Sequence, residues 1–350
     1  MFSIRIFGCI VLLGTLFAAV SSSASNKKFP IVYDKGYNYG TGLCVFDWFI
    51  KKLHPFDIKK SGNVVHALCR YGIDKKMFHK PIKVTDEELE LVHTKAYLSS
   101  LKKNDVVASI AEVWPLSIVP DCFNSLLQWF FLNPMRLATG GTQLATELAL
   151  KNKKSTINLG GGYHHAKKDS GEGFCFFADV PFAVKNLWKK NPNLKVMVVD
   201  LDAHRGNGIA SIFKDDKRIS IFDVYGDVNY PRRDNFLRRY IKYNWPLRFF
   251  VKDKPYHEIV DKHLKKAVKK SKPDLIIYNA GTDILDGDPL GRFRISKKGV
   301  VKRDELVFEA GKQKNIPVCM LLSGGYTNES AIVIADSIKN LIDKKYIEAA

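Results

Sequence analysis

Short apolar runs alternate with amphipathic stretches along most of the chain. Six runs are rich in valine and isoleucine and apolar on both faces, which predicts buried parallel strands. They occupy residues 30–33, 156–159, 195–200, 218–224, 274–279 and 316–322. Helical patterns lie between them, at 140–150, 182–190, 258–270 and 302–312. This alternation predicts an α/β fold, a single domain with a mostly parallel sheet flanked by helices on both faces.

Four of these runs lead directly into segments rich in glycine, histidine and aspartate. The segments are 160–165, 201–204, 280–283 and 323–326. Ligands of open parallel sheets bind beyond the carboxyl ends of the strands. We therefore expect the four loops to meet at one rim and to form the functional site.

The N-terminus differs from the rest of the chain. Residues 4–20 are apolar except for Arg5, and small residues follow, with Ser22 and Ala24 at the −3 and −1 positions of a cleavage site. This pattern is typical of a secretory signal peptide, and an uncleaved signal anchor is the alternative. We predict a leader at 1–24 and one catalytic domain at 25–350. The leader indicates the endoplasmic reticulum lumen or secretion, and an unused leader would leave the protein in nucleus or cytoplasm.

Composition excludes a disordered or fibrous chain, since 46% of the 350 residues are hydrophobic and 26% are charged. The net charge of +19 favours an anionic partner. Residues 232–272 carry 14 basic and 4 acidic residues and are the candidate surface for it, with a merely solvated face as the alternative. No sequence-specific nucleic-acid motif accompanies the charge. The cysteines beyond the leader, odd in number and sparse, form no disulfide framework.

A metal site is predicted where one of the strands ends. Asp200, Asp202 and His204 alternate with a period of two and would point to the same side of an extended segment. Asp283 can supply a third ligand from another strand end. Two carboxylates and one imidazole leave coordination positions open, as in catalytic sites. Zinc is the expected ion, with iron(II) or manganese as alternatives.

Histidine and tyrosine side chains follow glycines on the same rim. His164 and His165 come after three glycines, and Tyr326 comes after two. An imidazole beside a metal can take a proton from a water that the metal activates. A phenol beside the metal suits stabilisation of an oxyanion in acyl transfer.

Six ordered motifs resemble the zinc-dependent histone deacetylases. They are GGGYHHA at 160–166, GFC at 173–175, VDLDAHRGNG at 199–208, NAGTD at 279–283, GDP at 287–289 and SGGY at 323–326. The resemblance runs from about residue 30 to residue 341. It is closest to class IV, for which LHPF at 53–56, VHT at 92–94, DVY at 223–225 and KRDELVF at 302–308 also have counterparts. The same fold occurs in the arginase-like ureohydrolases, which bind two metals with a further Asp where this chain has Gly206.

The resemblance implies a role for each matching residue. It implies one Zn²⁺ held by Asp202, His204 and Asp283. His165 matches the general base, His164 its neighbour, Asp200 the carboxylate that orients His164, and Tyr326 the oxyanion donor. Gly173, Phe174 and Tyr230 match the walls of the acyl-lysine tunnel. A structural potassium ion near the strand of Asp200 is also implied, and the sequence leaves it open.

The implied function is a zinc-dependent amidohydrolase that removes acyl groups from lysine side chains of proteins or peptides. Asn207 stands where many family members have an Asp, so His165 should be less basic. We interpret this as a class IV trait, and class IV implies a preference for long-chain fatty acyl groups over acetyl.

Two alternatives remain at the level of the sequence. One is a secreted or lumenal basic protein that uses a deacetylase fold only to bind a partner, although a binder has no need for intact metal ligands. The other is a deacetylase of small acetylated amines such as polyamines. The basic surface disfavours polycationic substrates of that kind.

Overall fold

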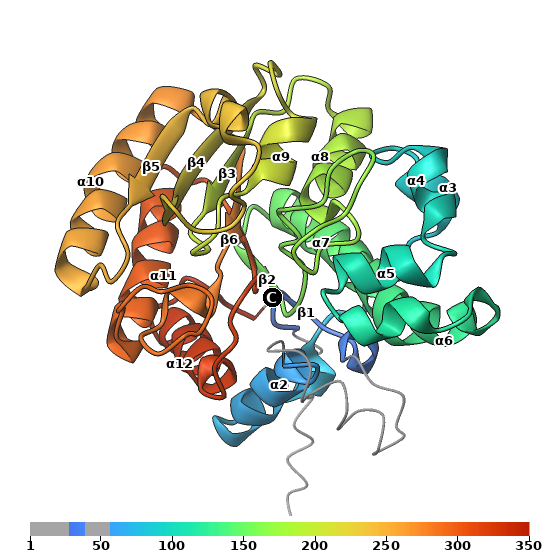
Figure 1. Cartoon of the computed structure of the whole chain (residues 1–350). Coiled ribbons are helices and arrows are strands. Elements are labelled where there is room, and N and C mark those ends of the chain that lie inside the picture. The colour runs from blue at the N-terminus through green and yellow to red at the C-terminus, as the bar shows by residue number, and fades with distance from the viewer. Residues whose placement is uncertain (1–27, 39–56, 350) are drawn as a thin grey trace, which may run out of the picture.

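The computed structural model describes residues 28–38 and 57–349. Within these residues, seven strands form one parallel sheet in the order β1-β2-β7-β6-β3-β4-β5 (Figure 1). The strands are β1 Ile31–Val32, β2 Thr156–Asn158, β3 Val196–Asp200, β4 Ile219–Gly226, β5 Tyr243–Leu247, β6 Leu275–Asn279 and β7 Val318–Leu321. The predicted fold class is confirmed, with a sheet that is entirely parallel.

All six predicted strands are present, and β5 is the strand that the pattern missed. Its sequence is Tyr-Asn-Trp-Pro-Leu, and every residue is at least partly exposed. β5 lies at the edge of the sheet and pairs only with β4. An edge strand has no need for apolar residues on both faces and tolerates a proline, so it lacks the signature of a buried strand.

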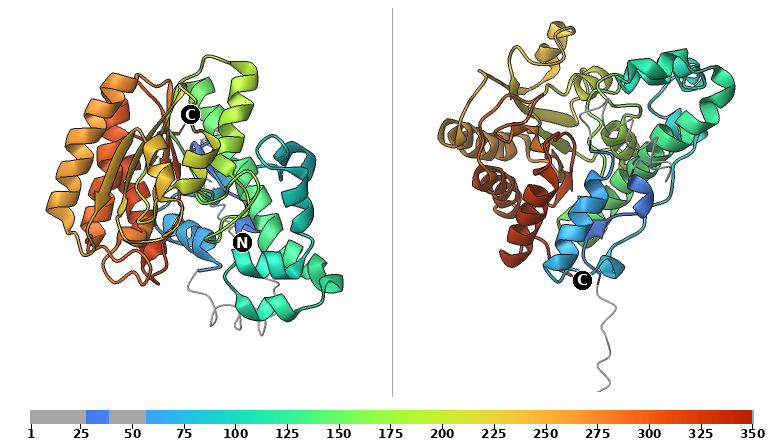
Figure 2. Two further views of the ribbon diagram at one scale, coloured as in Figure 1. Left: turned by 45° about the horizontal axis from the view of Figure 1, so that its top comes forward. Right: turned by 60° about the horizontal axis from the view of Figure 1, so that its bottom comes forward.

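Helices cover both faces of the sheet, as Figures 1 and 2 show. One face packs against α10 (Asp253–Ser271), α11 (Lys297–Lys312) and α12 (Ser330–Asp343), with α2 (Lys60–Arg70) beside α12. The other packs against α7 (Asn133–Asn152), α8 (Asp179–Lys190) and α9 (Asn207–Ile212). Each helix buries one apolar stripe, and the central strands are therefore buried on both sides.

A cluster of short helices extends the domain beyond α7. It contains α3 (Asp86–Leu89), α4 (Lys95–Ser100), α5 (Asn104–Ile110) and α6 (Asn124–Leu127), with a separate core that includes Phe130 and Phe176. The sequence pattern did not predict it, because helices this short carry no sustained period of 3.6 residues.

The register of the sheet brings four strand ends to one level. Asp200 at the end of β3 pairs with Asn279 at the end of β6, and Leu321 at the end of β7 pairs with both Asn279 and Asn158. The loops that follow β2, β3, β6 and β7 therefore leave the sheet side by side. The predicted convergence on one rim is confirmed.

Two predictions fall outside the described residues, the leader at 1–24 and the LHPF motif at 53–56, and Cys44 lies outside them as well. Cys69, Cys122, Cys175 and Cys319 are free thiols. Among the helices that the structure describes, none has the length and apolar character needed to span a bilayer.

Candidate active site

Three side chains at the rim form a metal-binding cluster. Asp202 and His204 follow β3, and Asp283 lies in the short turn η7 (Thr282–Ile284) after β6. All three are buried, and one ligand atom from each lies within 4.8 Å of the others. Nδ1 of His204 lies 2.9 Å from Oδ1 of Asp202 and 2.8 Å from Oδ2 of Asp283. Two carboxylates and one imidazole suit zinc and leave positions for water and substrate.

Asp200 turns away from this cluster. β3 ends at Asp200, so the expected extended segment through His204 is wrong. The Asp202 amide donates to Asp200 Oδ1 at 3.3 Å, and the His204 amide donates to Asp202 Oδ1 at 3.0 Å. An aspartate that accepts the amide two residues on favours a turn over a strand. These two successive turns bring Asp202 and His204 to the rim.

The two adjacent histidines follow a tight glycine loop after β2. Gly161 and Gly162 have φ angles of +73° and +87°, which residues with a side chain rarely adopt. The buried carboxylate of Asp179 accepts the Gly162 and Tyr163 amides at 2.8 and 2.9 Å. The loop is thereby fixed immediately before His164.

Different partners give the two histidines different protonation states. His164 Nδ1 lies 2.8 Å from Asp200 Oδ2, and His165 Nδ1 lies 2.8 Å from Asn207 Oδ1. Burial alone would lower the pKa of His164, but Asp200 and Asp202 raise it to about 9. Burial and the neighbouring His164 hold the pKa of His165 well below its usual value. The pKa values of the two imidazoles are thus shifted in opposite directions, although the ring centroids lie only 4.0 Å apart.

Tyr326 lies near the metal-binding cluster, with its ring centroid 6.5 Å from that of His204. Its backbone amide donates to the buried Asp288 carboxylate at 2.8 Å. Burial raises the pKa of the Tyr326 phenol well above its usual value. The side chain therefore keeps its proton and can donate a hydrogen bond.

The predicted tunnel residues surround the approach to this cluster. Gly173 and Phe174 both have positive φ angles, and a Cβ on Gly173 would come within 2.6 Å of the His165 ring. The Tyr230 ring lies 4.9 Å from the same histidine. A mouth cavity of about 160 Å³ opens here, lined in part by Glu112, Phe174, Tyr230, Arg292 and Tyr326.

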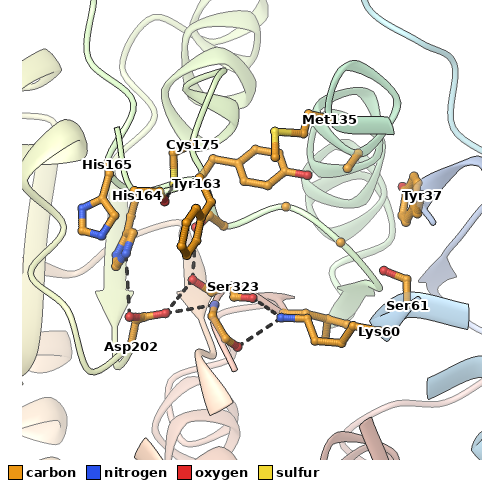
Figure 3. A pocket seen from close by; sticks show the side chains of 18 of the residues that line it. Tyr37, Lys60, Ser61, Met135, Tyr163, His164, His165, Cys175, Asp202 and Ser323 are labelled. Atoms are coloured by element: carbon orange, nitrogen blue, oxygen red, sulfur yellow. Dashed lines mark hydrogen bonds and ion pairs between the residues drawn. The ribbon is translucent and has the colours of Figure 1, made fainter. Parts of the chain in front are cut away.

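A second, inner cavity lies beyond the histidines, as Figure 3 shows. It has a volume of about 50 Å³, and its lining includes Tyr37, Lys60, Met135 and the glycines 160–162. The buried Lys60 ammonium donates to the backbone carbonyls of Ser323 and Gly324. The inner cavity therefore has both apolar walls and a cation.

Two buried charged residues, Arg303 and Asp304, hold the rim loops, and the sequence did not indicate this role. Arg303 on α11 donates to the carbonyl oxygens of Leu201, Ala280 and Gly281. These three residues lie in the loops that carry the metal ligands. Asp304 pairs with it and accepts the hydroxyls of Tyr278 and Ser337. The KRDELVF motif contains both, but its helical charge pattern looks like a solvated face.

Two buried carboxylates lie side by side below the metal-binding cluster. Asp200 and Asp223 are cross-strand neighbours on β3 and β4. Oδ2 of Asp223 accepts the Gly206 amide at 3.1 Å, whereas its Oδ1 has no hydrogen-bond partner among the described residues. Burial and the Asp200 charge raise the pKa of Asp223 well above its usual range. A monovalent cation bound here would stabilise both carboxylates.

Comparison with known proteins identifies a family and a shared fold. Residues 54–342 match the histone deacetylase domain. "Histone deacetylase 2" of Arabidopsis thaliana is 42% identical over 316 residues, which cover 90% of this chain and 79% of the relative. "Histone deacetylase 1" of Homo sapiens is 30% identical over 326 residues, which cover 87% of this chain and 62% of the relative. The crystal structure of the HDA15 HD domain matches with a TM-score of 0.68 at 19% identity, over 90% of this chain and 88% of that one.

Proposed function

The chain belongs to the histone deacetylase family of hydrolases, and on that premise we propose that it removes acyl groups from lysine side chains of proteins or peptides. The observation that carries this proposal is the buried cluster of Asp202, His204 and Asp283 beside two adjacent histidines, which are held by Asp200 and Asn207. Zinc bound by these three residues would polarise the substrate carbonyl and lower the pKa of a water.

The other residues then have defined tasks. His165, neutral and held by Asn207, takes a proton from the attacking water. Tyr326 donates to the oxyanion that forms on the substrate carbonyl. His164, charged and held by Asp200, supplies positive charge and can return a proton to the lysine amine as the C–N bond breaks. The products are a free lysine side chain and a carboxylic acid.

The experiment is turnover of acyl-lysine peptides by the zinc-loaded protein, with and without a chelator. We expect turnover that the chelator abolishes and added zinc restores. Full activity after chelation, or in the Asp202→Ala protein, would overturn the assignment.

We also propose a class IV type enzyme that prefers long-chain fatty acyl groups. Motifs at 92–94, 223–225 and 302–308 support the class, and the long-chain preference follows from that resemblance. The test compares kcat/KM for myristoyl-lysine and acetyl-lysine in one peptide sequence. A higher value for acetyl-lysine would contradict the preference.

A structural potassium ion between Asp200 and Asp223 is part of the proposal. The orphaned Oδ1 of Asp223 supports it. We expect the melting temperature to rise in potassium chloride relative to tetramethylammonium chloride at equal ionic strength. An Asp223→Asn protein should lose that difference, because the second buried charge is gone.

The leader at 1–24 and an address in the secretory pathway remain proposals that rest on the sequence pattern. N-terminal sequencing of the protein from fractionated cells tests both. A mature terminus near residue 25 in the lumenal fraction is expected, and an intact Met1 in nucleus or cytoplasm would contradict it.

A further inference from the structure

The exposed Arg292 lines the mouth of the predicted tunnel, and the exposed Arg248 and Arg294 lie on the same two paired segments. We propose that Arg248, Arg292 and Arg294, here called the arginine strip, bind acidic residues that flank the acyl-lysine. Substrates would then be acyl-lysines in acidic peptide segments rather than in lysine-rich tails. The inference rests on the proposed function and adds a substrate class to it.

Two segments that are far apart in the sequence build the strip side by side. The Phe250 amide donates to the Arg292 carbonyl at 2.8 Å, and the Arg294 amide donates to the Val251 carbonyl at 2.9 Å. The Arg292 guanidinium lies 5.2 Å from the Phe249 ring centre, and that of Arg294 lies 4.7 Å from the Phe250 ring centre. Stacking holds the guanidinium plane while its N–H groups remain available for a carboxylate.

A buried carboxylate fixes this strip to the catalytic residues. Asp288 accepts the amides of Leu290 and Gly291 as well as that of Tyr326. Gly291 approaches the backbone of Asp283 so closely that a Cβ would lie 1.8 Å from its carbonyl oxygen. Arg292 is the next residue and lines the mouth cavity. The strip therefore has a set position relative to the tunnel.

The charge of the strip is not neutralised within the described chain. All three arginines are exposed, and no described carboxylate lies within 4.0 Å of their guanidinium nitrogens. Nearby cations differ, because Arg238 pairs with Asp227 at 2.7 Å and Lys167 pairs with Asp234 at 2.5 Å. Glu112 also lines the mouth cavity but pairs with none of the three. Planar, unpaired guanidinium groups favour carboxylates that can accept two hydrogen bonds.

The position of the strip decides which anion it meets. An acyl-lysine inserted in the tunnel leaves its neighbouring residues at the mouth, where Arg292 lies. Aspartate and glutamate side chains of the substrate are therefore the expected partners, and lysines at the same positions would be repelled. Anionic lipid headgroups are the competing source of charge.

The experiment uses three peptides with the same acyl-lysine and with flanks of Asp/Glu, Ser/Gly or Lys. We expect kcat/KM for the acidic peptide to exceed that for the neutral one by about tenfold, from two partly exposed charge-assisted hydrogen bonds. Binding of the same peptides, followed by fluorescence anisotropy, gives a second readout that needs no turnover. Vesicles with and without phosphatidylserine form a separate arm.

The matched variants both remove two positive charges. Arg292→Asn with Arg294→Gln should abolish the acidic preference, measured as the ratio of kcat/KM for the acidic and neutral peptides, and asparagine suits the φ of +57° at position 292. Lys262→Gln with Lys266→Gln, on the exposed face of α10, should keep the preference. That control separates local contact from the general positive field.

The outcomes separate this inference from the proposed function. No turnover of any peptide contradicts the proposed function, and anisotropy still reports on the strip. Turnover of all three peptides with equal kcat/KM, equal loss of preference in both double variants, or arginine-dependent binding to phosphatidylserine vesicles without a peptide preference would each overturn the inference.

Discussion

The floor and the mouth of the active site are built on opposite principles. On the catalytic floor, formed by His164, His165, Asp202, His204 and Asp283, each side chain is buried and lies within hydrogen-bond distance of another buried group. The arginine strip is exposed, and stacking on phenylalanine rings orients two of its three arginines.

Substitutions should therefore have much larger effects on the floor than on the strip. Removing one partner of a buried charged pair leaves the other charge with neither a partner nor water, which lowers stability by about 3–5 kcal/mol. Water replaces the missing partner of an exposed charge, so removing one member of an exposed pair lowers stability by about 1 kcal/mol or less. The floor therefore decides whether the reaction occurs, and the strip selects among substrates.

The largest expected effect comes from the metal ligands. Asp202→Ala or His204→Ala should lower kcat/KM by about 10⁴-fold or more, because loss of the metal would remove both carbonyl polarisation and activation of the water. The measurement is peptide turnover with the zinc content of the same sample. Asp261→Ala, which removes a partly exposed carboxylate that pairs with Lys265 on α10, is the control and should keep both turnover and zinc content. A variant with bound zinc and normal turnover would refute the floor as described.

The second largest expected effect is a loss of stability when the buried Arg303–Asp304 pair is broken. Arg303→Met removes the donors to the loops of Asp202 and Asp283 and leaves Asp304 buried, so the free energy of unfolding should fall by about 3–5 kcal/mol. Urea unfolding measures it. Lys302→Met, one residue away in a partly exposed pair with Glu305, should change stability by less than about 1 kcal/mol. Equal losses would mean that burial does not distinguish the two positions.

Tyr326→Phe removes one hydroxyl from the site without removing a charge. The expected loss in kcat is about 10²- to 10³-fold with little change in KM, because the phenol acts on the oxyanion rather than on bound substrate. Steady-state kinetics on the zinc-loaded protein test this. Tyr346→Phe, which lines neither cavity and bonds to Glu309, should be neutral. A rise in KM alone would assign Tyr326 to substrate binding.

Acid should lower the stability of the fold through the buried His93. His93 accepts the Ala178 amide at 3.0 Å, and burial lowers its pKa from 6.5 to about 4. Above pH 6.5 it is neutral in both the folded and the unfolded state. As pH falls towards 4, only the unfolded state takes up the proton, so stability is lost, by about 2 kcal/mol between pH 7 and pH 5.

Urea unfolding at the two pH values measures this loss. His93→Gln should show a loss smaller by about that amount, because glutamine does not titrate. The same pH dependence in both proteins would place the acid sensitivity elsewhere.

The floor could be predicted from the sequence and the strip could not. Asp202, His204 and Asp283 follow apolar strands that end at one level, so the strand pattern alone gathers them. Arg303 was missed because a buried arginine inside a charged helix has the composition of an exposed one. The pairing of Phe250 with Arg292 depends on the unpredicted edge strand β5 and on two segments about 40 residues apart.

The smallest expected effect concerns salt at the arginine strip. Raising the ionic strength from about 0.05 to 0.3 M shortens the Debye length from roughly 14 Å to roughly 6 Å and so screens exposed charges more strongly. The kcat/KM for the acidic peptide should fall by about two- to fourfold, while that for the neutral peptide stays constant, because the buried floor is screened much less. The Arg292→Asn, Arg294→Gln protein should show a flat response for both peptides. An equal fall for both would show that salt acts on the floor, and would remove the distinction between the two regions.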